Sequence, residues 1–327
     1  MRVLVTGGTG FIGSRLVAAL LERGDAVRVL RRDGSSLLGL QDLPVEYLIG
    51  DILDPASVAR AAQGCDMVFH VAAISSYWRA GRQQVYRVNV EGTRIVMEAC
   101  LRAEVGRVVV TSSVAAIGIP SDGKPAKEET PFDAVSASFA YADSKHRAEG
   151  EVDRAVKQGL AAVIVNPAVV IGAGDHYMVS SSMVIEFARH ALPAVPPGGM
   201  CVADIDAVVQ GHLAAAERGR VGERYILGGE NLSYRQITAT MAAICGRPAP
   251  SRTMPRWLLP PVATGIDIYN RVSRQPPVVS GEQVRLSAYE AYFDSTKAVQ
   301  ELGYPLLPFR NAASQAYAWY KANGYLN

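Results

Sequence analysis

The segment TGGTGFIG at residues 6–13 constrains the fold of this chain more than any other feature. It follows the strand-like run RVLVT and precedes an amphipathic helical pattern, which is the setting that a dinucleotide-binding turn requires. Gly7, Gly10 and Gly13 are spaced as GxxGxxG. Glycine at these positions permits a tight turn and lets a pyrophosphate approach the backbone, while the following helix N-terminus offers N–H groups to the anion. The segment therefore predicts a dinucleotide site.

The second strand-like run ends in VLRRDG at 29–34, where a site for NAD usually has an acidic residue that holds the ribose 2′-hydroxyl. Arg31 and Arg32 stand there instead. A guanidinium attracts a 2′-phosphate and can bind it through two hydrogen bonds, so the pair indicates NADP(H) as the cofactor. The alternative is that both arginines are solvated and that Asp33 holds the ribose.

Strand-like runs and helical patterns alternate through the N-terminal half of the chain. This alternation predicts an α/β fold, a Rossmann-type doubly wound parallel sheet covered by helices on both faces. The expected strands are 2–6, 26–30, 45–50, 66–73, 107–113 and 161–167, and the expected helices are 11–23, 54–64, 83–104 and 136–159.

After Pro167 the alternation is lost, and proline and glycine become frequent. We expect a smaller, mostly C-terminal α/β substrate domain in this region. A helical pattern at 202–219 and a strand-like run at 223–229 are expected to return to the first sheet. On this reading the NADP-binding Rossmann domain comprises 1–166 and about 202–228, and the substrate-binding domain comprises 167–201 and 229–327.

Composition narrows the partners and the location. With 49% hydrophobic residues, 20% charged residues and a net charge of +2, the chain is globular in composition and has no strong field toward nucleic acid or membrane. The four cysteines lie far apart without a Cys/His cluster, which indicates reduced core residues and no metal site. The opening MRVLVTGG lacks a signal-like pattern, and no apolar run reaches the ~18 residues of a membrane span. We therefore expect a cytoplasmic protein.

A candidate proton donor lies in YADSK at residues 141–145. Tyr141 and Lys145 share one helical face, so the ammonium is expected to favour the phenolate and bring the pKa of the tyrosine closer to neutral. Such a tyrosine can protonate a carbonyl oxygen as hydride arrives, or deprotonate an alcohol in reverse. Ser113 ends the run RVVVTSS, at the carboxyl edge where parallel sheets bind ligands, and is expected to hydrogen-bond the same substrate oxygen.

Four motifs occur in order: TGGTGFIG, YRVNVEGT at 86–93, TSS at 111–113 and YADSK. On these motifs the chain resembles the extended short-chain dehydrogenase/reductase superfamily. VFHVAA, VVTSSVAAIG and RYILGGEN make it most similar to dihydroflavonol-4-reductase-like proteins, in particular to the bacterial group of hopanoid-associated sugar epimerases. The resemblance covers the N-terminal sheet and continues more weakly to about residue 230.

The resemblance implies roles for individual residues. Ser113, Tyr141 and Lys145 would be the catalytic set, with Ser112 as the fallback serine, and Asn89 would support the active-site helix or a proton-relay water. The implied cofactor contacts are Gly7, Gly10, Phe11, Ile12, Gly13, Arg31, Arg32, Asp51, Ile52, Ala72, Ala73, Lys145 and Pro167. A homodimer through the helices at 83–104 and 136–159 is implied in the same way.

Several further residues are candidates for contact with a substrate. Ser75, Tyr77 and Trp78 follow the fourth strand, where a substrate wall would stand. The two aromatic rings either stack on a flat or apolar substrate or pack at the domain interface. His176 and Tyr177 face the same choice, and for these we favour a flexible lid.

Three other features are expected to be structural. GIPSDGKP at 118–125 has the GxxxxGK spacing of a phosphate-binding loop but lacks the Ser/Thr and the amphipathic helix that should follow. Asp206 is expected to cap a helix rather than to bind a metal. His70, on a buried strand, is expected to be a satisfied core histidine.

Together these features predict an NADPH-dependent reductase of a small-molecule ketone or aldehyde, with Tyr141 as general acid/base. The alternative is a nucleotide-sugar epimerase or dehydratase that uses the same Ser–Tyr–Lys site for a transient oxidation. Arg and Asn side chains at 166–300 show no spacing that indicates a diphosphate site. A non-catalytic NADP-sensing protein is a minor alternative, because such proteins typically lack the tyrosine–lysine pair.

Overall fold

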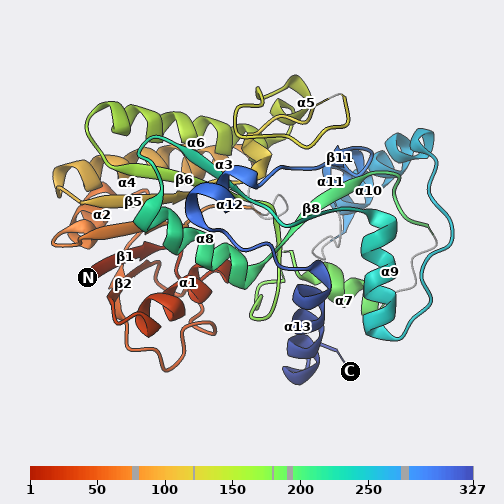
Figure 1. The fold of residues 1–327 in the computed structure, drawn as a ribbon, viewed down its shortest axis with the longest axis horizontal. Helices are drawn as coiled ribbons and strands as arrows, with labels where there is room; N and C mark the ends of the chain where they lie inside the picture. Colours follow the sequence, from red (N-terminus) through yellow and green to blue (C-terminus); the bar gives the residue numbers. More distant parts are fainter. Residues whose placement is uncertain (76–80, 121, 179, 190–193, 274–279, 327) are drawn as a thin grey trace.

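The computed structural model describes residues 1–75, 81–120, 122–178, 180–189, 194–273 and 280–326, and it is organised around a seven-stranded sheet (Figure 1). All neighbouring strands in this sheet are parallel, in the order β3-β2-β1-β4-β5-β6-β9. The order runs outward in both directions from β1, which confirms the predicted doubly wound Rossmann-type fold. The strands are β1 (Arg2–Thr6), β2 (Ala26–Arg31), β3 (Glu46–Ile49), β4 (Met67–His70), β5 (Arg107–Thr111), β6 (Ala162–Pro167) and β9 (Arg224–Leu227).

Helices cover both faces of this sheet (Figure 1). The pair α1 and α8 packs on one face, and α2, α4 and α6 pack on the other. In β1, Val3 and Val5 enter the core on the first face while Leu4 enters the core on the second. A strand that is buried on both faces carries consecutive apolar residues, which explains the run RVLVT. These helices are α1 (Phe11–Glu22), α2 (Pro55–Ala62), α4 (Gly92–Arg102), α6 (Ala140–Lys157) and α8 (Ile205–Arg218).

A second, four-stranded sheet is built around β8 (Gly199–Asp204). An antiparallel strand, β10 (Glu230–Ser233), pairs with β8, and β7 (Val169–Ile171) and β11 (Glu290–Ala291) pair parallel with it. The chain then passes from β8 directly into α8 and back to the first sheet. Residues 202–204 thus belong to β8 of the second sheet, and the proposed division of the chain into two domains stays a prediction.

Further helices surround the second sheet. The three helices α7, α9 and α13 share a hydrophobic core with β8, and α10 packs against α11 (Figure 1). Among the described residues, no helix combines the length and the apolar character needed to cross a membrane. These helices are α7 (Ser182–Arg189), α9 (Tyr234–Cys245), α10 (Leu259–Val272), α11 (Gly281–Leu286) and α13 (Phe309–Ala322). The helix α12 (Thr296–Leu302) packs instead against α8 and against β9 of the first sheet.

Two predicted helices are interrupted. The region 83–104 comprises α3 (Arg82–Tyr86), a π-helical turn (Arg87–Glu91) and α4, and the region 136–159 comprises α5 (Ala134–Ala137) and α6. The second break arises because Phe139 has an extended backbone, with φ −91° and ψ 120°. Tyr141 consequently lies in the first turn of α6, and not in the interior of a longer helix.

The start of α8 also differs from the prediction. The helix begins at Ile205, because residues 202–204 belong to β8. Asp204 is therefore the cap, and its Oδ1 accepts a hydrogen bond from Asp206 N at 2.7 Å. Asp206 instead forms an ion pair with Arg15 at 2.7 Å, so the prediction that Asp206 caps the helix was wrong.

Candidate active site

The glycine turn at the end of β1 has two positions that exclude any side chain. Gly7 has φ +72°, and a Cβ at this position would lie 2.5 Å from Ala72 N. A Cβ on Gly13 would lie 2.1 Å from Gly7 O. Gly10 precedes α1, and within the described residues no side chain caps the first N–H groups of that helix. The turn and the helix N-terminus thus keep the close approach and the donors that a pyrophosphate needs.

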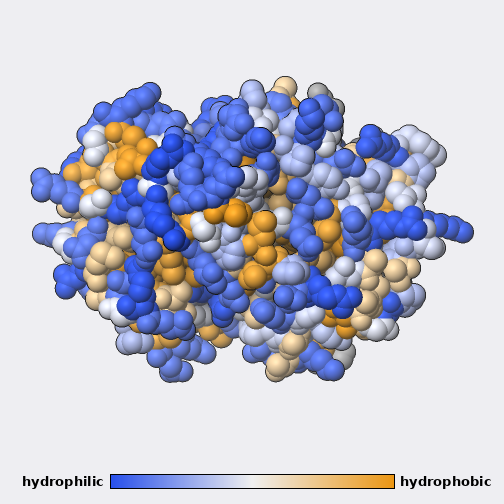
Figure 2. Space-filling model, in the orientation of Figure 1, coloured by the Kyte–Doolittle hydropathy of each residue, from blue (hydrophilic) through white to orange (hydrophobic). Residues whose placement is uncertain are grey.

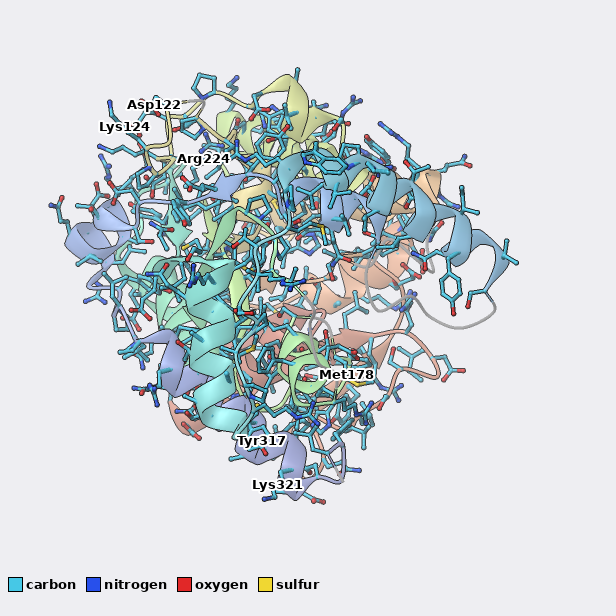
Figure 3. All side chains as sticks on the ribbon, turned by 90° about the vertical axis from the view of Figure 1, so that its right-hand side faces the viewer. Asp122, Lys124, Met178, Arg224, Tyr317 and Lys321 are labelled. Atoms are coloured by element: carbon cyan, nitrogen blue, oxygen red, sulfur yellow. The ribbon has the colours of Figure 1, made fainter. Side chains whose placement is uncertain are left out.

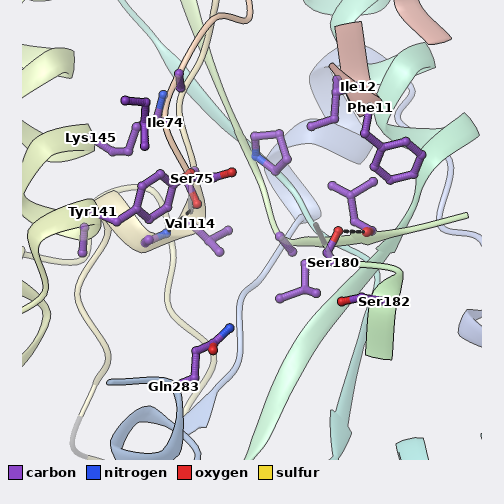
Figure 4. Close-up of a pocket in the computed structure, with 18 of the residues that line it drawn as sticks. Phe11, Ile12, Ile74, Ser75, Val114, Tyr141, Lys145, Ser180, Ser182 and Gln283 are labelled. Carbon is purple, nitrogen blue, oxygen red and sulfur yellow. Dashed lines mark hydrogen bonds between the residues drawn. The ribbon is translucent and has the colours of Figure 1, made fainter. Parts of the chain in front are cut away.

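A cavity of about 1400 Å³ begins at this turn and extends to the second sheet. All of the residues predicted to contact the cofactor line it. Its volume exceeds the ~300–1,000 Å³ that is typical of one small-molecule pocket, so a dinucleotide and a substrate can share it. Figure 4 shows Phe11 and Ile12 of the glycine turn across the cavity from Tyr141 and Lys145.

Arg31 and Arg32 lie where β2 ends, and both line the cavity. The Arg31 guanidinium stands over the Tyr47 ring, with Cζ 5.6 Å from the ring centroid. Its Nε is buried and has no hydrogen-bond partner among the described residues. A buried donor without a partner is costly, so this end of the cavity suits an anionic group of a ligand. Asp33, the alternative ribose contact, is exposed.

Ser113, Tyr141 and Lys145 all line the same cavity. Ser113 follows β5, and its Oγ accepts a hydrogen bond from Ala115 N at 3.2 Å. A second hydrogen bond joins the Ser113 and Tyr141 hydroxyls. The Lys145 ammonium donates to Thr111 O at 2.7 Å. The three side chains therefore come together from the end of β5 and the first turns of α6.

Ser112 extends the sheet instead, because its N–H donates to Val165 O at 2.8 Å. Ser112 also lines the cavity, and its Oγ is buried without a hydrogen-bond partner among the described residues. The geometry thus gives Ser113 the contact with Tyr141, and leaves Ser112 with a free hydroxyl beside it.

Burial determines the protonation of this group. It raises the pKa of Tyr141, and the hydrogen bond from Ser113 offsets the rise only in part. The expected shift of this pKa toward neutral was therefore wrong for the protein alone, because desolvation of the phenolate outweighs its stabilisation. Burial also lowers the pKa of Lys145 to about 8, against the opposing charge of Glu149. At neutral pH the tyrosine is protonated and the lysine is mostly charged.

Two buried residues that the sequence analysis did not assign to the site hold it in place. Asn166 Nδ2 donates to Ser113 O at 2.9 Å and to Glu149 Oε1 at 2.7 Å. Arg224 pairs with the other carboxylate oxygen of Glu149 at 3.0 Å. The four-residue spacing from Lys145 to Glu149 on one helical face was a signal for Glu149. Asn166 on β6 has no comparable local signal.

Asn89 acts as a clamp within the π-helical turn. Its Oδ1 accepts from Ile74 N at 2.8 Å, and its Nδ2 donates to Ile74 O at 3.0 Å and to Ser144 Oγ at 2.9 Å. Both amide hydrogens are thus engaged by protein atoms. Of the two predicted roles, the support of the active-site helix fits this geometry better than the binding of a relay water.

Some of the residues that were expected to contact the substrate line the cavity, and others do not. Ser75 and Tyr177 line the cavity, and the Tyr177 hydroxyl donates to Ser36 O at 3.2 Å. The His176 ring packs edge-to-face on Trp319, with centroids 4.8 Å apart, and is not part of the described lining. The expectation that His176 contacts substrate is therefore not supported. Tyr77 and Trp78 lie outside the described residues.

Lys124 and His70 come from features that were expected to be structural, and neither is among the described lining residues of the cavity. Lys124, in the segment with GxxxxGK spacing, is exposed and pairs with Asp122 at 3.3 Å. Figure 3 shows both residues at the end of the molecule opposite Tyr317. His70 is a satisfied core histidine, with Nδ1 2.7 Å from Thr6 Oγ1.

Comparisons with known proteins agree with this geometry. The model of the NAD dependent epimerase/dehydratase family matches residues 3–228. A Synechocystis protein named "Putative dihydroflavonol 4-reductase" is 40% identical over 327 residues, which are 98% of this chain and 95% of that protein. The crystal structure of gox2253 has 38% identity and a TM-score of 0.88, and covers 100% of this chain and 99% of its own. DesIV, a dTDP-glucose 4,6-dehydratase from Streptomyces venezuelae with NAD and TYD bound, has 25% identity and a TM-score of 0.80, with 100% and 99% covered.

The parallel sheet, the glycine turn and the Ser–Tyr–Lys group define a protein of the extended short-chain dehydrogenase/reductase superfamily. Within this superfamily the chain belongs to the NAD-dependent epimerase/dehydratase family. The predicted superfamily and the likeness to dihydroflavonol-4-reductase-like proteins are thereby confirmed. The relatives include reductases as well as dehydratases, so family membership alone leaves the reaction to be argued from the site.

Proposed function

We propose that the protein is an NADPH-dependent reductase of a ketone or an aldehyde. The observation that carries this proposal is the contact between the Ser113 and Tyr141 hydroxyls in a cavity that begins at the glycine turn. Two adjacent hydroxyls can both hydrogen-bond one carbonyl oxygen and so stabilise the negative charge that develops on it. The reductase name of the Synechocystis relative supports the same chemistry.

Tyr141 acts as the general acid. Because burial raises its pKa, the phenol keeps its proton at neutral pH, and reduction requires that proton on the carbonyl oxygen. Ser113 orients this oxygen. Lys145 remains mostly protonated at pH 7, and its charge stabilises the phenolate that proton transfer leaves behind.

The residues of the cavity also fit the cofactor. NADPH, when bound, supplies the hydride. The glycine turn and the N-terminus of α1 would hold its pyrophosphate, because Gly7 and Gly13 leave the backbone open. Arg31 and Arg32 would hold the 2′-phosphate, and Lys145 would also contact the nicotinamide ribose.

A nucleotide-sugar epimerase or dehydratase is the second candidate, and the DesIV structure with NAD favours it. In that case the same tyrosine would take a proton from an alcohol during a transient oxidation. Such an enzyme retains its NAD, whereas a reductase must exchange its cofactor at every turnover. Identification of the nucleotide released from the denatured protein separates the two: copurified NAD supports the epimerase, and NADPH that exchanges freely supports the reductase.

The Tyr141→Phe variant tests the proposal directly. A panel of ketones and aldehydes is screened with the wild-type protein by following NADPH absorbance, and the variant is measured on the best substrate. Loss of general acid catalysis should lower kcat by about 10²–10⁴-fold, with the Kd for NADPH unchanged. Tyr317→Phe, on α13, is the matched control and should retain full activity. A Tyr141→Phe variant that turns over at the normal rate would show that the assigned role is wrong.

A further inference from the structure

The cavity ends in an apolar chamber within the second part of the molecule. We define the distal chamber by six lining residues: Met183 and Phe187 of α7, Met200 of β8, Ile237 and Met241 of α9, and Met254. Phe187, Ile237 and Met241 belong to the core shared by α7, α9 and α13, and the other two helix and strand methionines pack against that core. The chamber is therefore an opening into a hydrophobic core. On the face shown in Figure 2, hydrophobic residues also gather near the middle of the molecule.

The charged lining residues lie almost entirely at the other end of the cavity. Among the described lining residues, the charged ones are Arg31, Arg32, Asp51, Lys145 and Glu186. Only Glu186, on α7, comes from the chain after Pro167, and it is acidic. A nucleotide diphosphate requires cationic partners, typically arginines that bind its oxygens in pairs. The described wall of the distal chamber offers none.

The methionines indicate what the chamber can hold. Methionine is unbranched and polarisable, and it adapts its shape to an irregular apolar surface. Four of them among the lining residues suit a bulky aliphatic body. Ser182, Tyr234 and Thr238 also line this part of the cavity and can hold a small number of polar groups of a ligand. Each CH₂ group that leaves water for such a wall contributes ~0.8 kcal/mol, which is about a fourfold gain in affinity.

The hydroxyls of Ser113 and Tyr141 share one cavity with the residues of the distal chamber. Figure 4 shows Gln283 of α11, Ser180, and Ser182 at the start of α7 across the cavity from Tyr141. A substrate whose carbonyl group contacts Tyr141 can therefore place the rest of its molecule elsewhere in the same cavity, including the chamber.

We propose that the reacting carbonyl is attached to a bulky aliphatic body, and that this body occupies the distal chamber. The inference rests on the proposed function and names its substrate class: an apolar ketone or aldehyde in place of a nucleotide-linked sugar. Met241 and Met254 determine specificity because they contact the body of the substrate and lie outside the Ser–Tyr–Lys group.

A homologous series of 2-alkanones, from 2-butanone to 2-dodecanone, tests the inference. In the presence of NADPH, Kd and kcat/KM should improve by about fourfold for each methylene until the chamber is filled. Met241→Gln and Met254→Gln introduce an amide of similar size. Each substitution should weaken the binding of 2-dodecanone by at least about tenfold. The binding of 2-butanone and of NADPH should be unchanged. Met241→Leu should retain the chain-length dependence, and Leu306→Gln, at a 56% exposed position, is the surface control.

The outcomes separate this inference from the proposed function. If short ketones are reduced but chain length has no effect, or if UDP-glucose binds more tightly than 2-dodecanone, the assignment of the chamber is overturned. The proposed reductase activity is then still supported by the reduction of short ketones. A different result is that no ketone is reduced, that 1-dodecanol still binds more tightly than 1-butanol, and that Met241→Gln removes this difference. This result would support the assignment of the chamber and contradict the proposed reductase activity.

Discussion

The Asn89 side chain holds both main-chain polar groups of Ile74, through hydrogen bonds of 2.8 and 3.0 Å. Ile74 lines the cavity, while the third partner of Asn89, Ser144, belongs to α6. One amide thus fixes a cavity wall against the helix that carries Tyr141 and Lys145. π-Helical turns such as the one that carries Asn89 are frequent at functional sites.

Replacement of Asn89 by alanine should loosen this wall. The two part-buried main-chain groups of Ile74 would lose their hydrogen bonds to Asn89, while Ser144 Oγ would keep its hydrogen bond to Tyr141 O. The loss should lower the free energy of unfolding by ~1–3 kcal/mol. KM for the carbonyl substrate should rise more than the Kd for NADPH. Urea unfolding and steady-state kinetics measure the two effects, and Asn311→Ala, at an exposed position on α13, is the control. An Asn89→Ala variant with normal stability but a lost proton transfer would support a relay role instead.

The two adjacent serines should differ in their effect on catalysis. Ser113→Ala removes the hydroxyl that contacts Tyr141, and kcat should fall by roughly 10²-fold, as for loss of one donor to a developing oxyanion. Ser112→Ala removes a buried hydroxyl without a partner among the described residues, so it should leave kcat within about threefold and stability unchanged or slightly higher. Equal losses of kcat in the two variants would contradict the assignment of Ser113.

Glu149→Gln should change the pH dependence of the reaction. The carboxylate of Glu149 opposes the burial that lowers the pKa of Lys145 to about 8, so its removal lowers that pKa further. Lys145 then loses its proton at a lower pH, and the alkaline decline of kcat should move toward neutral. The loss should be on the order of tenfold at pH 8 and smaller at pH 6. Glu151→Gln, a buried position on the same helix that pairs with Arg154, should keep the wild-type profile.

Arg31→Ala and Arg32→Ala test the cofactor preference. Loss of a charged hydrogen bond to the 2′-phosphate should raise the Kd for NADPH by roughly 10–100-fold and the Kd for NADH by less than about threefold. Comparison of the two variants shows which guanidinium carries the contact, and Arg235→Ala, on α9, serves as a charge-matched control. If NADPH and NADH weaken equally, the phosphate contact is wrong, and Asp33→Ala becomes the variant to measure for NADH.

His212 should make the protein sensitive to mild acid. Burial lowers the pKa of His212 to about 4, with an opposing hydrogen bond to Val208 O. Because the unfolded chain binds the proton near pH 6.5, stability falls as pH decreases below that value, by about 2 kcal/mol between pH 7 and pH 5. In urea titrations over the same pH interval, the free energy of unfolding of the His212→Gln variant should fall by roughly this amount less than that of the wild type. His176→Gln, at a half-buried position, should show the wild-type decline.

The sequence was sufficient for those parts of the fold that depend on local pattern. Residue spacing within a single element was enough to predict the glycine turn, the strands of the first sheet and the Tyr141–Lys145 pair. The individual strands of the second sheet were not predicted, because β7, β10 and β11 are short and gain their partners only through β8. The break at Phe139 was missed because the flanking residues are compatible with helix, and tertiary packing determines the extended backbone there.

The residues at the centre of the candidate site could be predicted from the sequence, but the residues that hold them in position could not. Ser113 and Tyr141 were found from motifs, whereas Asn166 enters the site from β6 through contacts across the sheet. The pKa of Tyr141 was misjudged for a related reason: the neighbouring ammonium is visible in the sequence, but the burial of the phenol is not. Lining residues of the distal chamber come from three separate elements and a loop, and they share no sequence signature.

The return of the chain from β8 to the first sheet has a consequence for synthesis on the ribosome. The strand β9, at residues 224–227, completes the sheet by pairing with β6 at residues 162–167. Until it emerges, a nascent chain that has already formed the other six strands presents β6 as an open edge with unpaired N–H and C=O groups. Translation that stops shortly before residue 224 should therefore give a fragment prone to aggregation, although it contains the glycine turn and the whole Ser–Tyr–Lys group.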